Sequence, residues 1–286
     1  MTLDATQQLD KQAQAIATTL TIPPCPEVIA KIVRESHADD PDLKRIGLLV
    51  SQDIALAATL LQTVNSPFYG LRSPIHSIHQ ALMMLGLRTV KSLVMALLLR
   101  QAFPKVNSPG MQRFWRDSAR NAALGTFVAR SAGRIDKDLA YTYGLFRHCG
   151  MPILRTQFDA YEPIIARSVS ERRGSLITIE RKQFGIDHAV LGAKLAGDWH
   201  LGPNTCEAIR HDSEYPGSEV LRAAAPKESL ALVAIGVIVD WIDDRIQNVE
   251  PTLDDEFDFA LECLDISSDA VEVMVLKVPE ALAGVG

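Results

Sequence analysis

Four cysteines stand far apart in a chain of 286 residues, at Cys25, Cys149, Cys206 and Cys263. No two of them form the Cys-x-x-Cys pair that begins a zinc knuckle or a dithiol redox site. Scattered thiols in a chain of this size are typical of reduced, buried cysteines in a cytosolic protein. The spacing therefore predicts that the protein is cytoplasmic. Cys149 is expected to act as a small buried apolar side chain.

Three arginines can form a basic face on one helix. Arg113, Arg116 and Arg120 follow the i, i+3, i+7 spacing that places side chains on one side of a helix, and Asp117 interrupts them. A solvated face is the default interpretation. The functional interpretation is contact with an anion or a nucleotide.

The formal charge of −6 is unevenly distributed. Residues 240–286 hold thirteen acidic and two basic residues, a net charge of −11, which leaves +5 for residues 1–239. A net-acidic chain with an acidic C-terminal segment is a poor candidate for general nucleic-acid binding.

Periodic apolar residues predict helices along almost the whole chain. Residues 54–64 and 75–85 each place them on one face, and residues 88–100 are apolar nearly all round, as in a central buried helix. Further helices are expected to begin at Glu27 and to cover 112–131, 187–199, 204–211, 227–244, 253–263 and 268–281. Only residues 176–179 alternate as a strand does, and they are too few for a sheet. The expected fold class is all-α.

Proline-rich connections suggest two lobes. Three prolines in residues 21–26 predict an extended linker, and Ser77 can cap the helix that follows the loop at 65–74. Residues 103–110 hold two prolines and a glycine between strong helical patterns. We predict an N-terminal helical lobe over residues 1–106 and a C-terminal lobe over residues 107–286 that ends in acidic helices.

We expect no membrane segment. Residues 1–14 are polar and lack the apolar core of a signal peptide. The longest apolar run, Leu230–Val239, stops at Asp240, well short of the roughly 20 residues that a membrane helix needs.

The order of motifs resembles one family. Residues 60–70 read Leu-Leu-Gln-Thr-Val-Asn-Ser-Pro-Phe-Tyr-Gly and match the Leu-Leu-x-x-x-Asn-Ser-Pro-x-Tyr-Gly string of the HDOD family, the HD-related output domain of bacterial signalling proteins. A Pro-x-x-Pro linker precedes this string, and blocks at 114–122, 144–150 and 184–199 extend the resemblance over roughly residues 20–245. Ile54 departs from it, because the family usually has proline there. The resemblance implies an all-helical, two-lobed module that acts as a signalling output and binding element.

The resemblance also locates the positions that bind metal in HD phosphohydrolases. They are occupied here by Asp117, Arg147, His148, His188, His211 and Asp240. Arg147 and His148 replace the His-Asp dyad, and a guanidinium has no lone pair to donate. At an effective dielectric of about 20, its charge about 4 Å from a divalent ion costs on the order of 8 kcal/mol. We therefore expect no metal, no other cofactor and no enzymatic activity, and we expect Arg147 to form an internal ion pair with Asp117.

The two later histidines also have plain structural explanations. His188 can cap a helix or hydrogen-bond a neighbouring loop, and His211 at a helix C-terminus can interact with the helix dipole. Residues 214–216, Glu-Tyr-Pro, resemble the Gly-Tyr-Pro signature of cyclic-di-GMP phosphodiesterases but lack the glycine, so a turn is expected.

Three functions follow from these patterns. The first is a non-catalytic signalling module that binds a protein partner in trans, or a small anionic ligand, and that can form a homodimer. Its candidate contact residues are Asn65, Ser66, Tyr69, Arg72, Arg113, Arg116 and Arg120. The second is a divergent metal-dependent phosphohydrolase that uses the acidic and histidine positions above. The third, a nucleic-acid-binding regulator that uses the arginine stripe, is disfavoured by the net charge.

Overall fold

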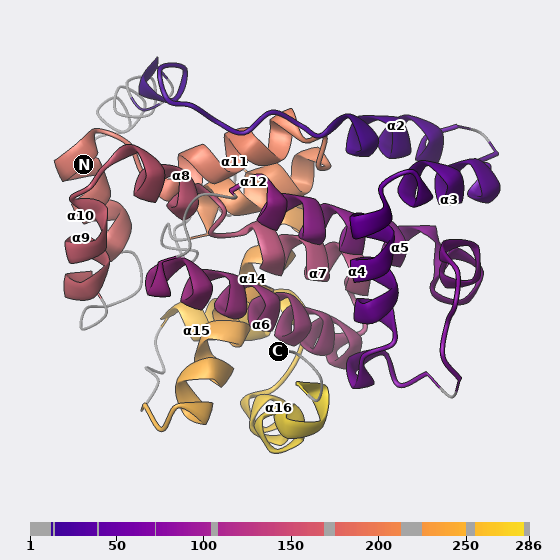
Figure 1. Cartoon of the computed structure of the whole chain (residues 1–286). Helices are drawn as coiled ribbons and strands as arrows, with labels where there is room; N and C mark the ends of the chain where they lie inside the picture. The colour runs from indigo at the N-terminus through magenta and orange to yellow at the C-terminus, as the bar shows by residue number, and fades with distance from the viewer. Residues whose placement is uncertain are drawn as a thin grey trace.

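The structure is a computed structural model that describes residues 13, 15–38, 40–71, 73–103, 108–168, 175–212, 225–249 and 255–282. Arg72, the expected turn at 214–216 and residues 104–107 of the expected lobe boundary lie outside the described residues. The described part consists of helices without a strand, which confirms the all-α fold class (Figure 1).

The helices follow one another along the chain and are named as in Figure 1. They are α2 (Glu27–Ser36), α3 (Leu43–Ser51), α4 (Ile54–Val64), the short 3-10 helix η1 (Pro67–Tyr69), α5 (Ile78–Gln101), α6 (Pro109–Ala132), α7 (Lys137–Phe146), α8 (Gly150–Gln157), α9 (Tyr161–Ser168), α10 (Ser175–Phe184), α11 (His188–Asp198), α12 (Pro203–His211), α14 (Lys227–Ile246), α15 (Asp255–Leu264) and α16 (Ser268–Ala281).

Side-chain caps mark where several helices begin. Ser77 accepts a hydrogen bond from the backbone N–H of Gln80 at 3.1 Å and caps α5, as predicted. Asp53 and Asp187 cap α4 and α11 in the same way. Each cap satisfies a backbone N–H that the helix leaves free, so polar residues in the sequence define these helix starts.

Helix α5 contains a break at Gly86, whose φ of 84° and ψ of 162° are not helical. Glycine adopts such a positive φ without the steric cost that a Cβ would bring. The break separates the two helical segments that the sequence predicts over residues 75–85 and 88–100. The first segment begins later than predicted, at Ile78.

The strand-like interpretation of residues 176–179 is wrong, because they lie in α10. Four alternating residues carry too little information to outweigh tertiary contacts. Here Ile177 and Glu180 are both buried, and the Glu180 carboxylate bonds to residues of neighbouring helices. The sequence also does not predict α3, α7, α8 and α9, which span ten residues or fewer.

Two apolar clusters form the core. The larger joins residues of the expected N-terminal lobe, such as Leu60 and Leu93, to residues of the expected C-terminal lobe, such as Phe146 and Trp199. The smaller lies where α14 packs against α6, α15 and α16. The first cluster therefore continues across the seam where α5 meets α7.

One helix in the described part of the chain, Ile78–Gln101, is long and apolar enough to cross a bilayer by length and composition. The bent pair Leu43–Ser51 and Ile54–Val64 passes the same test only if it counts as one span. Leu93, Leu98 and Leu99 of the long helix are buried inside the protein. Such composition is equally typical of a core helix.

Helix α8 approaches α11 so closely that only glycine fits at position 150. A Cβ there would overlap the carbonyl oxygen of His188 and lie 2.8 Å from the backbone nitrogen of Gly192. We expect Gly150→Ala to lower the free energy of unfolding by about 1–3 kcal/mol, since two backbones would have to separate. Urea denaturation measures the change.

Gly197→Ala is the matched control on α11, because a Cβ at that position has no neighbour within 4 Å. We expect it to raise the free energy of unfolding by about 0.5–1 kcal/mol through the lower entropy of the unfolded chain. Equal effects of the two substitutions would contradict the close approach of α8 to α11.

Candidate functional site

A buried guanidinium lies at the centre of the candidate site. Arg147 directly follows α7, and 1% of its surface is exposed. Its Nη1 and Nη2 atoms donate to the two carboxylate oxygens of Asp240 at 2.9 and 2.8 Å, a bidentate pair. Its Nε lies 3.1 Å from Oδ1 of Asp212. The side chain thereby ties the end of α7 to the end of α12 and to the middle of α14.

Gly236 makes room for this arrangement on α14. Its carbonyl oxygen accepts a hydrogen bond from Nη1 of Arg147 at 3.3 Å. A Cβ at Gly236 would lie 2.8 Å from the Tyr143 hydroxyl and 3.1 Å from Oδ1 of Asp212. A glycine is therefore required where α14 passes the guanidinium.

The carboxylates next to Arg147 stabilise its charged form. Burial alone would lower the pKa of a guanidinium, but the carboxylates of Asp212 and Asp240 outweigh burial and raise the pKa of Arg147. The site therefore holds a permanent positive charge between two acidic side chains.

Asp212 connects the arginine to a second set of polar side chains. Its carboxylate accepts a hydrogen bond from the Tyr143 hydroxyl at 2.5 Å, and Nε2 of His148 lies 3.2 Å from it. No motif in the sequence indicates Asp212, although it immediately follows His211, a candidate ligand position. That adjacency was the available signal.

The two histidines of the site lie against each other. The rings of His148 and His188 meet edge to face, with centroids 5.6 Å apart. Nδ1 of His188 lies 2.7 Å from the Glu180 carboxylate, which also accepts the His188 backbone N–H at 2.9 Å. The Tyr161 hydroxyl donates to the other Glu180 oxygen at 2.5 Å. Glu180 and Tyr161 are site residues that no motif in the sequence indicates.

The environments of these histidines shift their pKa values in opposite directions. Burial lowers the pKa of His148, and the nearby Arg147 charge lowers it further, against a weaker upward effect of Asp212. Burial also disfavours the charged form of His188, but the Glu180 carboxylate outweighs it and raises the pKa of His188. The imidazolium is therefore favoured at His188 and disfavoured at His148.

The prediction that Arg147 forms an ion pair with Asp117 is wrong. Asp117 is 46% exposed and lies 3.9 Å from Arg120 on the same helix, whereas Arg147 pairs with Asp212 and Asp240. An aspartate on the outer face of α6 cannot reach a guanidinium that is turned towards α14. His211 lies on α12 with its Nε2 atom 3.0 Å from Glu207.

The residues present do not fit the metal centre that the resemblance implies. Within the described ranges, no group of three or more His, Cys, Asp or Glu side chains could hold a metal ion. Oxygens of Asp212 and Asp240 are directed at a guanidinium, which cannot ligate a cation and would repel one.

The Asn65 side chain has a structural role in its loop. Its amide nitrogen donates to the carbonyl oxygens of Leu61 and Ile75 at 2.9 and 2.8 Å, and its oxygen accepts the Ile75 N–H at 2.7 Å. Ser66 and Tyr69 from the same loop line a pocket.

The arginine stripe is partly neutralised. Arg113 and Arg116 are exposed on α6, as expected of a solvated face. Arg120, the third member, pairs with Asp243 of α14 at 2.9 Å. Two open arginines form a smaller basic surface than the spacing alone suggests. Cys149 is buried, as predicted, and its thiol lies 3.6 Å from the Gly192 carbonyl oxygen.

Removal of the central charge is expected to destabilise the protein severely. Arg147→Met leaves Asp212 buried without its counter-charge, and we expect a loss of about 3–5 kcal/mol in the free energy of unfolding. Arg88→Met, which breaks the exposed pair with Asp136, should cost less than about 1 kcal/mol. Equal losses in urea denaturation would show that the buried pair has no special role.

The two histidines are expected to give opposite pH dependences of stability. His188 has a raised pKa, so its stabilising contribution is complete below the unfolded-state pKa of about 6.5 and is lost as pH rises through the folded-state value. His148 has a lowered pKa, so its contribution is complete above about 6.5 and is lost as pH falls through the folded-state value. Urea denaturation from pH 5 to 9 of the wild type, His188→Gln and His148→Gln separates the two windows. The same pH dependence in both variants would contradict these environments.

Comparisons with known proteins show the family and the fold of this chain. The family model of the HDOD domain matches residues 22–215, more than half of the chain. An uncharacterized protein of Treponema pallidum is 26% identical over 213 residues, which cover 73% of this chain and 41% of that protein. The chain thus spans less than half the length of that relative.

Two solved structures show the same fold. An HDOD domain protein of unknown function from Geobacter sulfurreducens has a TM-score of 0.76 at 20% identity, with 98% of each chain covered. The "Putative phosphohydrolase" of Shewanella amazonensis has a TM-score of 0.73 at 20% identity, with 96% of each covered. The motif string at residues 60–70, the all-helical fold and the family match lead to one conclusion: this chain belongs to the HDOD family.

Proposed function

We propose that this chain is a non-catalytic signalling module that acts by binding a protein partner in the cytoplasm. The observation that carries the proposal is the buried guanidinium of Arg147, held between Asp212 and Asp240 where the HD resemblance implies a metal ligand. No disulfide joins the four cysteines among the described residues, which agrees with a reducing compartment.

Loss of the metal ligands would remove the chemistry of an HD phosphohydrolase. In such enzymes divalent ions lower the pKa of bound water and stabilise the charge on a phosphoryl oxygen. Here the ion pair of Arg147 holds three helices together at the same place, and His188 is committed to Glu180. A buried pair of this kind supports a defined packing arrangement more than it adds net stability.

Exposed apolar side chains support the N-terminal lobe as the docking surface. Leu48 is 66% exposed on α3, Ile54 is 84% exposed on α4, and Met83 and Met84 are 65% and 53% exposed on α5. Helices α3 and α5 pack together at Gly47, next to Leu48. Large apolar side chains exposed on neighbouring helices suit a protein-binding site, and a stable complex buries about 1,600 Å² in total.

The alternative is a divergent phosphohydrolase that uses Asp117, His188, His211 and Asp240. Only a likeness of fold favours it, and fold does not establish chemistry. To separate the two functions, the purified chain is incubated with Mn²⁺, Fe²⁺ or Zn²⁺ and desalted. Metal content and hydrolysis of bis(p-nitrophenyl) phosphate are then measured.

We expect no stoichiometric metal and no hydrolysis above the buffer rate. Near-stoichiometric metal, together with hydrolysis that Asp240→Asn abolishes, would overturn the non-catalytic proposal.

Partner binding is tested with the tagged full chain in extracts of the cells that produce it. We expect a partner that the wild type enriches and that Ile54→Glu or Met83→Glu loses, because a buried charge opposes docking. Leu276→Glu is the matched control, since Leu276 is 80% exposed on α16. Sedimentation of the purified chain shows whether that partner is a second copy of the chain. Failure to enrich any protein, or equal loss in all three variants, would contradict the proposed surface.

A further inference from the structure

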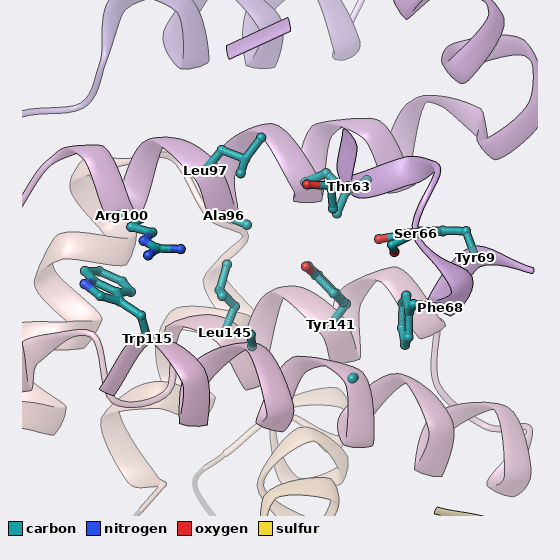
Figure 2. A pocket seen from close by; sticks show the side chains of 13 residues that line it. Thr63, Ser66, Phe68, Tyr69, Ala96, Leu97, Arg100, Trp115, Tyr141 and Leu145 are labelled. Carbon is teal, nitrogen blue, oxygen red and sulfur yellow. The ribbon is translucent and has the colours of Figure 1, made fainter. Parts of the chain in front are cut away.

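A pocket of about 180 Å³ lies at the seam between the N-terminal helices and the α6–α7 pair (Figure 2). Ser66 precedes η1, Arg100 lies in the last turn of α5, Trp115 belongs to α6, and Tyr141 and Leu145 belong to α7. The pocket is therefore built from both of the expected lobes.

The walls of the pocket suit a flat apolar molecule. Trp115 and Tyr141 contribute aromatic rings, and Leu97 and Leu145 contribute aliphatic side chains. A dry cavity of about 150 Å³ is large enough to hold benzene. The volume here therefore accommodates one aromatic ring with a small substituent and is below the range of most drug-sized sites.

Arg100 supplies a cation at one end of the pocket. Figure 2 shows its guanidinium next to the indole of Trp115 and directed into the pocket. Arg100 is exposed, as are Arg113, Arg116 and Arg130, and its side chain forms no ion pair or hydrogen bond with the described residues, so its donors are open to a ligand. Its planar fork of donors matches a carboxylate.

Hydroxyl groups lie towards the other end. In Figure 2 the side chain of Tyr141 points into the pocket, and the Ser66 hydroxyl lies nearby. Burial raises the pKa of Tyr141 to about 12, so its hydroxyl stays protonated at neutral pH. The Tyr141 hydroxyl makes no hydrogen bond within the described part of the chain and remains available as a donor.

We propose that this pocket binds a small aromatic monocarboxylate, with its ring between Trp115 and Tyr141 and its carboxylate on Arg100. The inference rests on the proposed function of the chain as a binding module and adds a ligand class to it. A ligand at this place contacts both lobes and can change how they pack, which links ligand binding to partner binding.

The charge of the pocket favours a monoanion. Among the described residues that line the pocket, Arg100 is the one cationic side chain. A neighbouring pocket of about 220 Å³ contains Arg130 and Lys137, of which Lys137 pairs with Asp138 at 2.8 Å. Phe68, Tyr69 and Tyr141 line both pockets, whereas Trp115 lines the first pocket beside Arg100.

Isothermal titration of the full chain with benzoate, phenylacetate and indole-3-carboxylate tests the proposal. Indole-3-carboxamide serves as the uncharged analogue, and inorganic phosphate as the anion without a ring. We expect saturable one-to-one binding of at least one carboxylate, tenfold or more tighter than the carboxamide, and no binding of phosphate.

Variants assign the binding to this pocket. Arg100→Gln should weaken carboxylate binding at least tenfold and leave carboxamide binding unchanged. Ala119→Leu fills the pocket and should abolish binding of both. Arg34→Gln, an exposed arginine on α2, is the matched control and should bind as the wild type does. Thermal unfolding of each variant checks that it remains folded.

Three results would overturn the site: no saturable binding of any of the carboxylates, equal affinities in Arg100→Gln and Arg34→Gln, or phosphate binding as tight as carboxylate binding. Partner capture with the same preparation separates this inference from the proposed function. If capture succeeds and titration fails, the pocket assignment alone is wrong. If titration succeeds and no partner is captured, the proposed docking function alone is wrong.

Discussion

The packing of the C-terminal half depends on one buried positive charge. Arg147 is in contact with Asp212 at the end of α12 and with Asp240 and Gly236 on α14, and each contact requires the others. A buried charge that loses a partner is far costlier than an apolar residue in its place, so the three helices can pack in few other ways. The guanidinium thus holds helices together at the place where the HD resemblance implies a metal.

The polar interior extends well beyond this ion pair. His148 contacts the Asp212 carboxylate through Nε2, its ring lies against that of His188, and His188 bonds to Glu180. Every link joins a different element, and each acidic side chain in the network lies against a histidine. Among the described residues, this network leaves no group of three His, Cys, Asp or Glu side chains that could hold a metal ion.

The proposed docking surface and the proposed ligand pocket are related through the seam between the expected lobes. The larger apolar cluster runs across it, so the two expected lobes share a core, and the packing leaves a pocket beside Arg100 and Trp115. Of the helices with exposed apolar residues, α4 and α5 also line the pocket. A molecule bound at the seam therefore acts on the helices that present the proposed docking surface.

The sequence by itself determined the all-α class, the family, most of the long helices and the inability of Arg147 to ligate a metal, because periodicity, caps and the chemistry of a guanidinium are local properties. Tertiary structure alone decided what Arg147 binds. Its partners lie 65 and 93 residues away along the chain, and Asp117, Asp212 and Asp240 are chemically equivalent as candidates. Helix packing turns Asp117 outward and brings the other two aspartates to the guanidinium. The same holds for Glu180, whose role follows from its position opposite His188 and not from any motif.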